Sequence, residues 1–269
     1  MEGNKMIIHK EINKPSKIKA IAEVTIFESI FFIFAWLLQA WEASGYGWYS
    51  KIIMIILGIT GIGIHWNKKQ YHLVPSNLKH TLHWALFTVA LFGIPSTIII
   101  IICVLLRQHD LIMKIVIDII WFFIFVGFAE ELFFRGYIQT RLNEAFTKKY
   151  KSIIGIKYQW TEGTLITAVF FFGIPHILVG INPFTGSINI SISLILIVFF
   201  ACFLGVIFSV IREKTGSIII PSILHGFIDF TVFSLGELIG FLNSNILVSI
   251  LLGIFFSFAF EKILLDKTS

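Results

Sequence analysis

The chain has 269 residues, of which 57% are hydrophobic and only 14% are charged. A soluble domain has about 45–50% apolar and about 25% charged residues, so this composition excludes an ordinary soluble protein and indicates an integral membrane protein. The net charge of +5 does not indicate a nucleic-acid partner. The basic residues lie between apolar runs, where such residues set membrane topology and contact anionic lipids.

Apolar runs long enough to cross a membrane follow one another along the chain. We predict eight transmembrane helices, at about residues 20–40, 52–66, 85–106, 112–138, 163–180, 191–210, 216–235 and 239–260. No long polar segment interrupts them, so we expect residues 1–269 to form a single polytopic membrane domain. The sequence therefore predicts an all-α membrane protein, a bundle of about eight transmembrane helices.

Lysine and arginine are distributed unevenly between the two sides of this predicted bundle. The N-terminal segment, the loops after the second, fourth and sixth helices, and the C-terminal tail together hold 17 of the 21 basic residues. The opposite side holds Lys51, Arg107 and Lys114, and Arg135 lies inside the fourth helix. Because basic loops tend to stay in the cytoplasm, we predict a multi-pass protein of the cell membrane with both termini cytoplasmic.

Ionisable side chains inside three of the predicted helices are candidates for function, because such groups are costly in hydrocarbon. They are Glu130, Glu131 and Arg135 in the fourth helix, His176 in the fifth, and His225 and Asp229 in the seventh. Counted at 1.5 Å per residue from the predicted cytoplasmic ends, Glu130, His176, His225 and Asp229 lie roughly 14 to 20 Å deep. We therefore expect these three helices to bring polar groups together in the cytoplasmic half of the membrane.

The spacing of these residues predicts which of them share a helix face. Glu131 and Arg135 are four residues apart, so they can form an ion pair within the helix, whereas Glu130 points about 100° away. His225 and Asp229 are also four apart and present an imidazole and a carboxylate side by side. We interpret Glu131 and Arg135 as structural support and Glu130 as the working group.

Three motifs occur in order along these helices: Glu-Glu-x-x-x-Arg from Glu130 to Arg135, Phe-x-x-x-His from Phe172 to His176, and His-x-x-x-Asp from His225 to Asp229. With these three motifs in this order, the chain resembles the CAAX-processing and bacteriocin-immunity family of intramembrane endopeptidases, which includes the type II CAAX prenyl endopeptidases. The similarity covers about residues 112–235, the expected catalytic core. Relatives often have Asn at the last position, so Asp229 makes metal ligation or acid–base work possible there.

Hydrolysis of a peptide bond needs an activated water molecule and a stabilised oxyanion. Glu130 with His176 can hold and deprotonate the water. His225, oriented by Asp229, can donate a hydrogen bond to the oxyanion. The family resemblance implies the same division of labour, with Glu131, Arg135 and Phe172 as structural support.

A metal site is the rival interpretation of the same residues. Two histidines and carboxylates form a plausible zinc set with an open position for water, and the ligand candidates are His176, His225, Asp229 and Glu130. The helical His-Glu-x-x-His zinc motif is absent from the sequence. We therefore favour a glutamate-dependent mechanism without a cofactor and keep zinc as the alternative.

The expected partners are a peptide or lipidated protein substrate and membrane lipids. The resemblance allows prenylated C-terminal peptides, signal or pheromone-like peptides, and bacteriocin self-immunity. A non-catalytic membrane scaffold or regulator that retains the fold is the alternative from another class. A transporter is a third, but the paired broken helices of inverted repeats, which would favour it, are not visible in the sequence.

Overall fold

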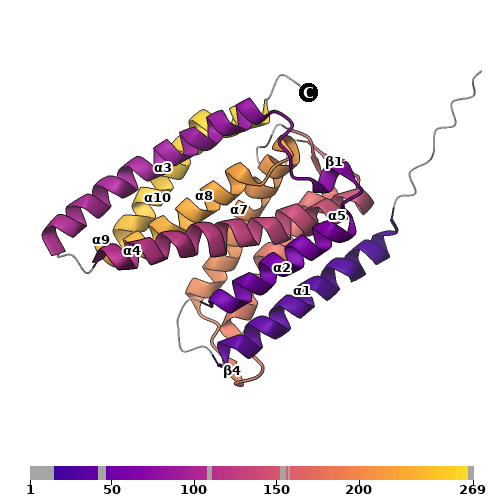
Figure 1. Ribbon diagram of the computed structural model, residues 1–269, viewed down its shortest axis with the longest axis horizontal. Helices are drawn as coiled ribbons and strands as arrows, with labels where there is room; N and C mark the ends of the chain where they lie inside the picture. The colour runs from indigo at the N-terminus through magenta and orange to yellow at the C-terminus, as the bar shows by residue number, and fades with distance from the viewer. Residues whose placement is uncertain (1–14, 42–46, 108–110, 152–155, 157, 266–269) are drawn as a thin grey trace, which may run out of the picture.

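The computed structural model describes residues 15–41, 47–107, 111–151, 156 and 158–265. Helices dominate this part of the chain (Figure 1), and seven of the described helices are long and apolar enough to cross a membrane. A shorter apolar helix, Trp48–Ile64, lies between the first two of them in the chain. The prediction of an all-α bundle of about eight helices is confirmed, and the protein is a multi-pass membrane protein.

Several of the spanning helices are continuous runs of α-, π- and 3-10-helical segments. The first three are α1 (Lys17–Gln39), α2 (Trp48–Ile64) and α3 (Leu78–Arg107), with the short η1 (Lys69–Tyr71) between α2 and α3. The fourth joins α4 (Leu111–Ile120), η2 (Trp121–Phe128), η3 (Glu131–Ile138) and α5 (Gln139–Ala145). The fifth joins α6 (Glu162–Ile166), η5 (Thr167–Gly173) and η6 (Ile174–Gly180). Then follow α7 (Ile192–Thr215), α8 (Ile219–Asp229) with η7 (Phe230–Ser234) and α9 (Leu235–Ile239), and α10 (Phe241–Phe255) with η8 (Phe256–Phe260) and α11 (Glu261–Leu264).

Residue types at the helix ends explain where several helices begin and end. The hydroxyls of Ser16 and Ser191 accept hydrogen bonds from the backbone N–H three residues later, which caps α1 and α7. Gly216 ends α7 with a φ of +73°, a conformation that glycine adopts without steric cost. These local signals set the ends of α7, the helix that packs behind the fifth helix.

Two small antiparallel hairpins lie between helices and were not predicted from the sequence. β1 (Lys149–Tyr150) pairs with β2 (Trp160–Thr161) in the connection between the fourth and fifth helices. β3 (Ile181–Asn182) pairs with β4 (Ser187–Ile188) in the connection between the fifth helix and α7. Strands of two residues are too short to give an alternating pattern, which explains why the sequence did not reveal them.

The fourth helix runs through the middle of the bundle, between α2 on one side and α8 on the other (Figure 1). η3 packs against α2 and η2 packs against α8, while α7 packs against η5 and η6. Close approach depends on glycines: a Cβ atom on Gly127 would lie 2.6 Å from the backbone oxygen of Ser222 and 3.0 Å from the backbone nitrogen of Gly226. Small residues of this kind let membrane helices approach until their backbones touch.

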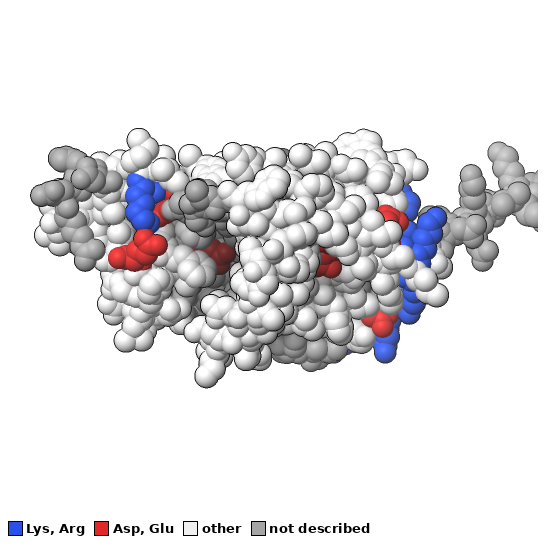
Figure 2. All heavy atoms as spheres, turned by 90° about the horizontal axis from the view of Figure 1, so that it is seen from below, with Lys and Arg blue, Asp and Glu red and all other residues white. Residues whose placement is uncertain are grey.

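The outer faces of the bundle are apolar, as a lipid environment requires. Exposed side chains along α3 and α7 include Ile94, Ile98, Ile195 and Phe199. Figure 2 shows one face on which few charged side chains lie between the two ends of the molecule. The charged groups of this face are concentrated at the ends, where headgroups and water would meet them.

The fourth helix is longer than the predicted segment 112–138, because it continues without a break from Leu111 to Ala145. Glu130 therefore lies fifteen residues from its end at Ala145, rather than nine residues from an end near residue 139. The sequence count missed this because the last two turns contain polar residues, among them Arg141 and Glu144, that are paired within the fold. The predicted depth of Glu130 is corrected accordingly.

We predict that Gly127→Ala destabilises the protein, because the new methyl group would collide with backbone atoms of α8 that cannot rotate away. Overpacking of this kind costs typically about 1–3 kcal/mol. Thermal unfolding in detergent would measure the loss. Gly63→Ala is the matched control, since nothing lies within 4 Å of a Cβ atom there. Equal stability of the two variants would contradict the proposed close packing of η2 on α8.

We also predict that reporter fusions at the N- and C-terminus both give a cytoplasmic signal, because the predicted spans assign both termini to the side with 17 of the 21 basic residues. A reporter inserted in the turn between β3 and β4 should give the opposite signal. An external signal from either terminus, or a cytoplasmic one from the β3–β4 turn, would refute this orientation.

Candidate active site

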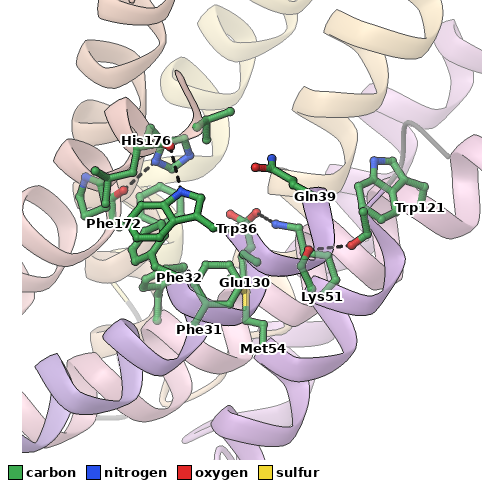
Figure 3. A pocket seen from close by; sticks show the side chains of 17 residues that line it. Phe31, Phe32, Trp36, Gln39, Lys51, Met54, Trp121, Glu130, Phe172 and His176 are labelled. Carbon is green, nitrogen blue, oxygen red and sulfur yellow. Dashed lines mark hydrogen bonds and ion pairs between the residues drawn. The ribbon is translucent and has the colours of Figure 1, made fainter. Parts of the chain in front are cut away.

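A cavity of about 460 Å³ opens between α1, α2, the fourth helix and the end of the fifth helix (Figure 3). Its polar lining includes Gln39, Lys51, Glu130 and His176. Much of the remaining wall is aromatic, from Phe31, Phe32, Trp36, Trp121, Phe134 and Phe172. The cavity thus combines a few convergent polar groups with apolar walls, as ligand sites commonly do.

Glu130 lies on the fourth helix between the two π-helical segments η2 and η3, and it is 8% exposed. Its Oε1 accepts a hydrogen bond from Lys51 Nζ, and the two groups form an ion pair across α2 and the fourth helix. Its Oε2 lies 3.8 Å from His225 Nε2. π-Helical turns occur frequently at functional sites, and here they flank the carboxylate that reaches the cavity.

Glu131 and Arg135 form the ion pair that their four-residue spacing predicted, at 2.9 Å, with both side chains fully buried. Arg135 also donates to the Ser209 hydroxyl and to the Gly205 carbonyl oxygen on α7. Its guanidinium carbon lies 3.8 Å from the centre of the Phe172 ring, a distance suited to a cation–π contact. The pair therefore ties the fourth helix to both the fifth helix and α7.

His225 is held from three directions, and one of its contacts was not predicted. Its Nδ1 lies 2.9 Å from Glu131 Oε1, and an ionised carboxylate can only accept a hydrogen bond, so the Nδ1–H donates there. The ring stacks on Phe208 and meets Phe172 edge-on. This leaves Nε2 facing Glu130. Glu131 thus positions the histidine as well as neutralising the arginine.

Asp229 lies one turn after His225, and its Oδ2 is 3.5 Å from His225 Nε2. This spacing is longer than a good hydrogen bond. Neither His225 nor Asp229 is among the residues that line the cavity. His225 borders the cavity through Glu130, which its Nε2 faces, and Asp229 lies behind His225.

His176 lies near the end of the fifth helix, and it lines the same cavity as Glu130. Its Nδ1 is 2.7 Å from the Phe172 carbonyl oxygen, which can only accept, so Nδ1 carries the hydrogen and donates it. That bond orients the ring and leaves Nε2 as the ring nitrogen that the Phe172 carbonyl does not engage (Figure 3). The structure therefore brings Glu130 and His176 to one cavity, as the sequence suggested.

The cavity lies in a different half of the bundle from the one expected. Its wall includes the last turn of α1 at Gln39, the first turn of α2 at Ser50 and Lys51, and the end of η6 at Val179. These positions lie at the same end of the bundle as the β3–β4 hairpin, opposite the end that holds most of the described basic residues. The sequence analysis placed the polar groups in the half of the bundle nearer the basic segments. The structure places them in the other half, so this expectation is wrong. The reason is the length of the fourth helix described above.

Lys51 is the functional candidate that sequence reasoning missed. It was counted among three basic residues on the less basic side, where it served only to set topology. The structure instead directs its ammonium group onto Glu130. The available signal was its place just before an apolar run, where a long cationic side chain can extend inward along the helix.

The zinc alternative requires three protein ligands directed at one point. Among the described residues, no group of three or more His, Cys, Asp or Glu side chains is arranged to hold a metal ion. A histidine whose Nδ1–H bonds a carboxylate can still bind a metal through Nε2, so zinc remains the alternative that the chelator experiment below tests.

Comparison with known proteins gives one match. Residues 112–231 match the family model described as type II CAAX prenyl endopeptidase Rce1-like. The searches of curated proteins and of solved structures found no match. The matched segment contains all three motifs, from Glu130 to Asp229. The resemblance drawn from the sequence is confirmed: residues 112–231 of this chain are similar to the Rce1-like type II CAAX prenyl endopeptidases.

Proposed function

We propose that this protein hydrolyses peptide bonds of membrane-associated or lipidated substrates, with Glu130 as the general base. The observation that carries the proposal is the position of Glu130, which reaches an apolar cavity shared with His176 while it faces His225 from behind. A carboxylate in such surroundings has few competing solvent contacts, so it can act on a single bound water molecule.

The proposed reaction needs only protein side chains and water. Water held between Glu130 and His176 attacks the carbonyl carbon of the substrate, and Glu130 takes the proton that the water loses. The carbonyl oxygen becomes an oxyanion, which a hydrogen on His225 Nε2 stabilises. The C–N bond then breaks, and the leaving amine takes the proton back from Glu130.

Three contacts support the role given to His225. Glu131 fixes the ring through Nδ1, so Nε2 keeps one direction. The distances from Nε2 to Asp229 and to Glu130, 3.5 and 3.8 Å, are longer than strong hydrogen bonds, which leaves the Nε2–H able to serve a substrate oxygen. Asp229, placed beside the same nitrogen, favours the positive charge that helps an imidazole to stabilise an oxyanion.

The orientation that the basic residues predict also bears on the substrate. With both termini in the cytoplasm of a cell-membrane protein, the cavity lies nearer the outer face, because it adjoins the end of the bundle opposite the basic segments. We propose that the substrate is a membrane peptide whose cleavage site reaches this half of the bilayer.

We predict that Glu130→Gln abolishes cleavage of a fluorogenic membrane peptide, since the amide keeps the shape but cannot accept a proton. Loss of acid–base help typically costs about 10²–10⁴-fold in rate. Glu237→Gln is the matched control, because Glu237 is 55% exposed and contacts Lys114 away from the cavity. Both variants should elute as folded protein in detergent. Full activity of Glu130→Gln in an assay where the wild type cleaves would refute the proposed base, and it would favour a scaffold role for these residues.

We further predict that cleavage survives a strong chelator such as phenanthroline and that the purified protein holds no stoichiometric zinc. The reason is that the proposed mechanism uses protein groups alone. Metal analysis by mass spectrometry and the peptide assay with and without chelator test this. Chelator-sensitive activity that Zn²⁺ restores would reverse the assignment and make His176, His225 and Asp229 ligand candidates.

A further inference from the structure

Two further cavities adjoin each other between α7, the β1–β2 connection and the last helix, at the end of the bundle that holds most of the described basic residues. Their volumes are about 510 and 360 Å³. Ile156, Phe260 and Glu261 line both of them, so the two cavities form one groove, here called the α7–α11 groove. Among the described residues, none that lines this groove also lines the cavity of Glu130. The groove is therefore a separate candidate binding site.

The α7–α11 groove changes from polar to apolar along the direction of the helices. Lys149 and Glu261 line its mouth, whereas Phe203, Ile207 and Phe256 line its inner part. Phe203 is twelve residues before the last residue of α7, which is about 18 Å at 1.5 Å per residue. One leaflet contributes about 15 Å, half of the hydrocarbon core. A charged mouth above an apolar groove of this depth matches the shape of a phospholipid, with its headgroup outward and an acyl chain inward.

The groove is open to the bilayer along its inner part. Phe203 is 37% exposed on the outer face of α7, and Ser257 is exposed on the last helix. An acyl chain can therefore enter from the side, without passing through the core of the bundle.

The two charged groups at the mouth can both bind a headgroup. Lys149 Nζ lies 3.0 Å from Glu213 Oε1, and the lysine side chain is 51% exposed. Glu213 also accepts hydrogen bonds from the Thr161 backbone N–H and from the hydroxyls of Thr161 and Thr164, so it does not depend on Lys149. An ammonium group has three N–H donors, which leaves Lys149 able to bind a phosphate. Glu261 is exposed and brings a carboxylate to the same mouth from the last helix.

This pair of opposite charges selects among phospholipid headgroups. A headgroup with a phosphate and no cation would satisfy Lys149 but would place negative charge beside Glu261. A choline headgroup balances both charges, but its ammonium carries no N–H donor. An ethanolamine headgroup offers a phosphate to Lys149 and an ammonium whose N–H groups can donate to Glu261, and charge-assisted hydrogen bonds of this kind are strong.

We propose that the α7–α11 groove binds a phospholipid with a primary-amine headgroup, of the phosphatidylethanolamine class. Lys149 binds the phosphate, Glu261 binds the ammonium, and an acyl chain lies along Phe203, Ile207 and Phe256. The bound lipid joins the last helix to α7, which packs against the fifth helix on another side. This inference does not rest on the proposed function, because it concerns binding and no chemical step.

Native mass spectrometry of the full-length protein in detergent tests the headgroup. The protein is titrated with phosphatidylethanolamine, phosphatidylcholine and phosphatidylglycerol of the same acyl chains. The wild type should bind the ethanolamine lipid roughly two- to fivefold more tightly than either of the others, the scale of one partly exposed ion pair. Lys149→Gln should weaken the binding of all three lipids. Glu261→Gln should remove the preference over the choline lipid.

Matched controls exist for both charges. Lys148→Gln changes the neighbouring lysine, which lies over the Tyr150 ring and does not line the groove. Glu237→Gln changes an exposed carboxylate near Lys114, away from the groove. Both controls should bind the three lipids as the wild type does.

A second pair of variants tests the apolar part of the groove. Ser257→Trp places a large ring in the inner cavity and should weaken the binding of all three lipids. Ser249→Trp is its control, because Ser249 is also exposed on the last helix and its hydroxyl also bonds to the backbone carbonyl four residues earlier, but it does not line the groove.

Equal binding of the three lipids by the wild type, or tighter binding of phosphatidylglycerol, overturns the assigned headgroup. Equal lipid binding by Ser257→Trp and Ser249→Trp overturns the assigned groove, because the lipid would then bind elsewhere on the outer face. The comparison of lipids on the wild type needs no substitution, so it decides the headgroup even where a variant fails to fold.

Discussion

The fully buried ion pair between Glu131 and Arg135 constrains how the helices of this bundle can pack. Neither charge can remain in hydrocarbon without the other, and breaking a buried pair by removing one partner costs about 3–5 kcal/mol. The pair also binds beyond its own helix: Arg135 contacts Ser209 on α7 and the ring of Phe172, and Glu131 bonds to His225 on α8. Four segments therefore have to meet at this point for the charges to be satisfied.

This constraint determines where Glu130 goes. Adjacent residues on a helix point about 100° apart, so with Glu131 turned toward α8 and His225, Glu130 turns toward α2 and the cavity. The facing glycines Gly127 and Gly226 let η2 and α8 come close enough for His225 to reach both carboxylates. Glu131, the supporting residue, and Glu130, the proposed base, are therefore consecutive in sequence because the fourth helix packs against both α8 and α2.

The sequence predicted what depends on local spacing. A spacing of four residues in a helix accounts for the ion pair between Glu131 and Arg135 and for the nearness of His225 to Asp229. The length of the apolar runs accounts for the helical fold. Lys51 and the Glu131–His225 bond could not be predicted this way, since they join helices whose relative rotation depends on packing. The position of the cavity was mistaken because paired polar residues extend the fourth helix beyond its apolar run. The roles of the site residues remain proposals that the experiments above test.

The short length of α2 has a consequence for the membrane around the cavity. Its 17 residues span about 26 Å at 1.5 Å per residue, whereas the hydrocarbon core of a bilayer is about 30 Å thick. A helix shorter than the core draws the bilayer inward or extends its flanking polar side chains toward the headgroups. Because Lys51 and Ser50 lie in the first turn of this helix and line the cavity, we expect the lipid surface to dip beside the cavity. Water would then travel a shorter path through hydrocarbon to reach Glu130.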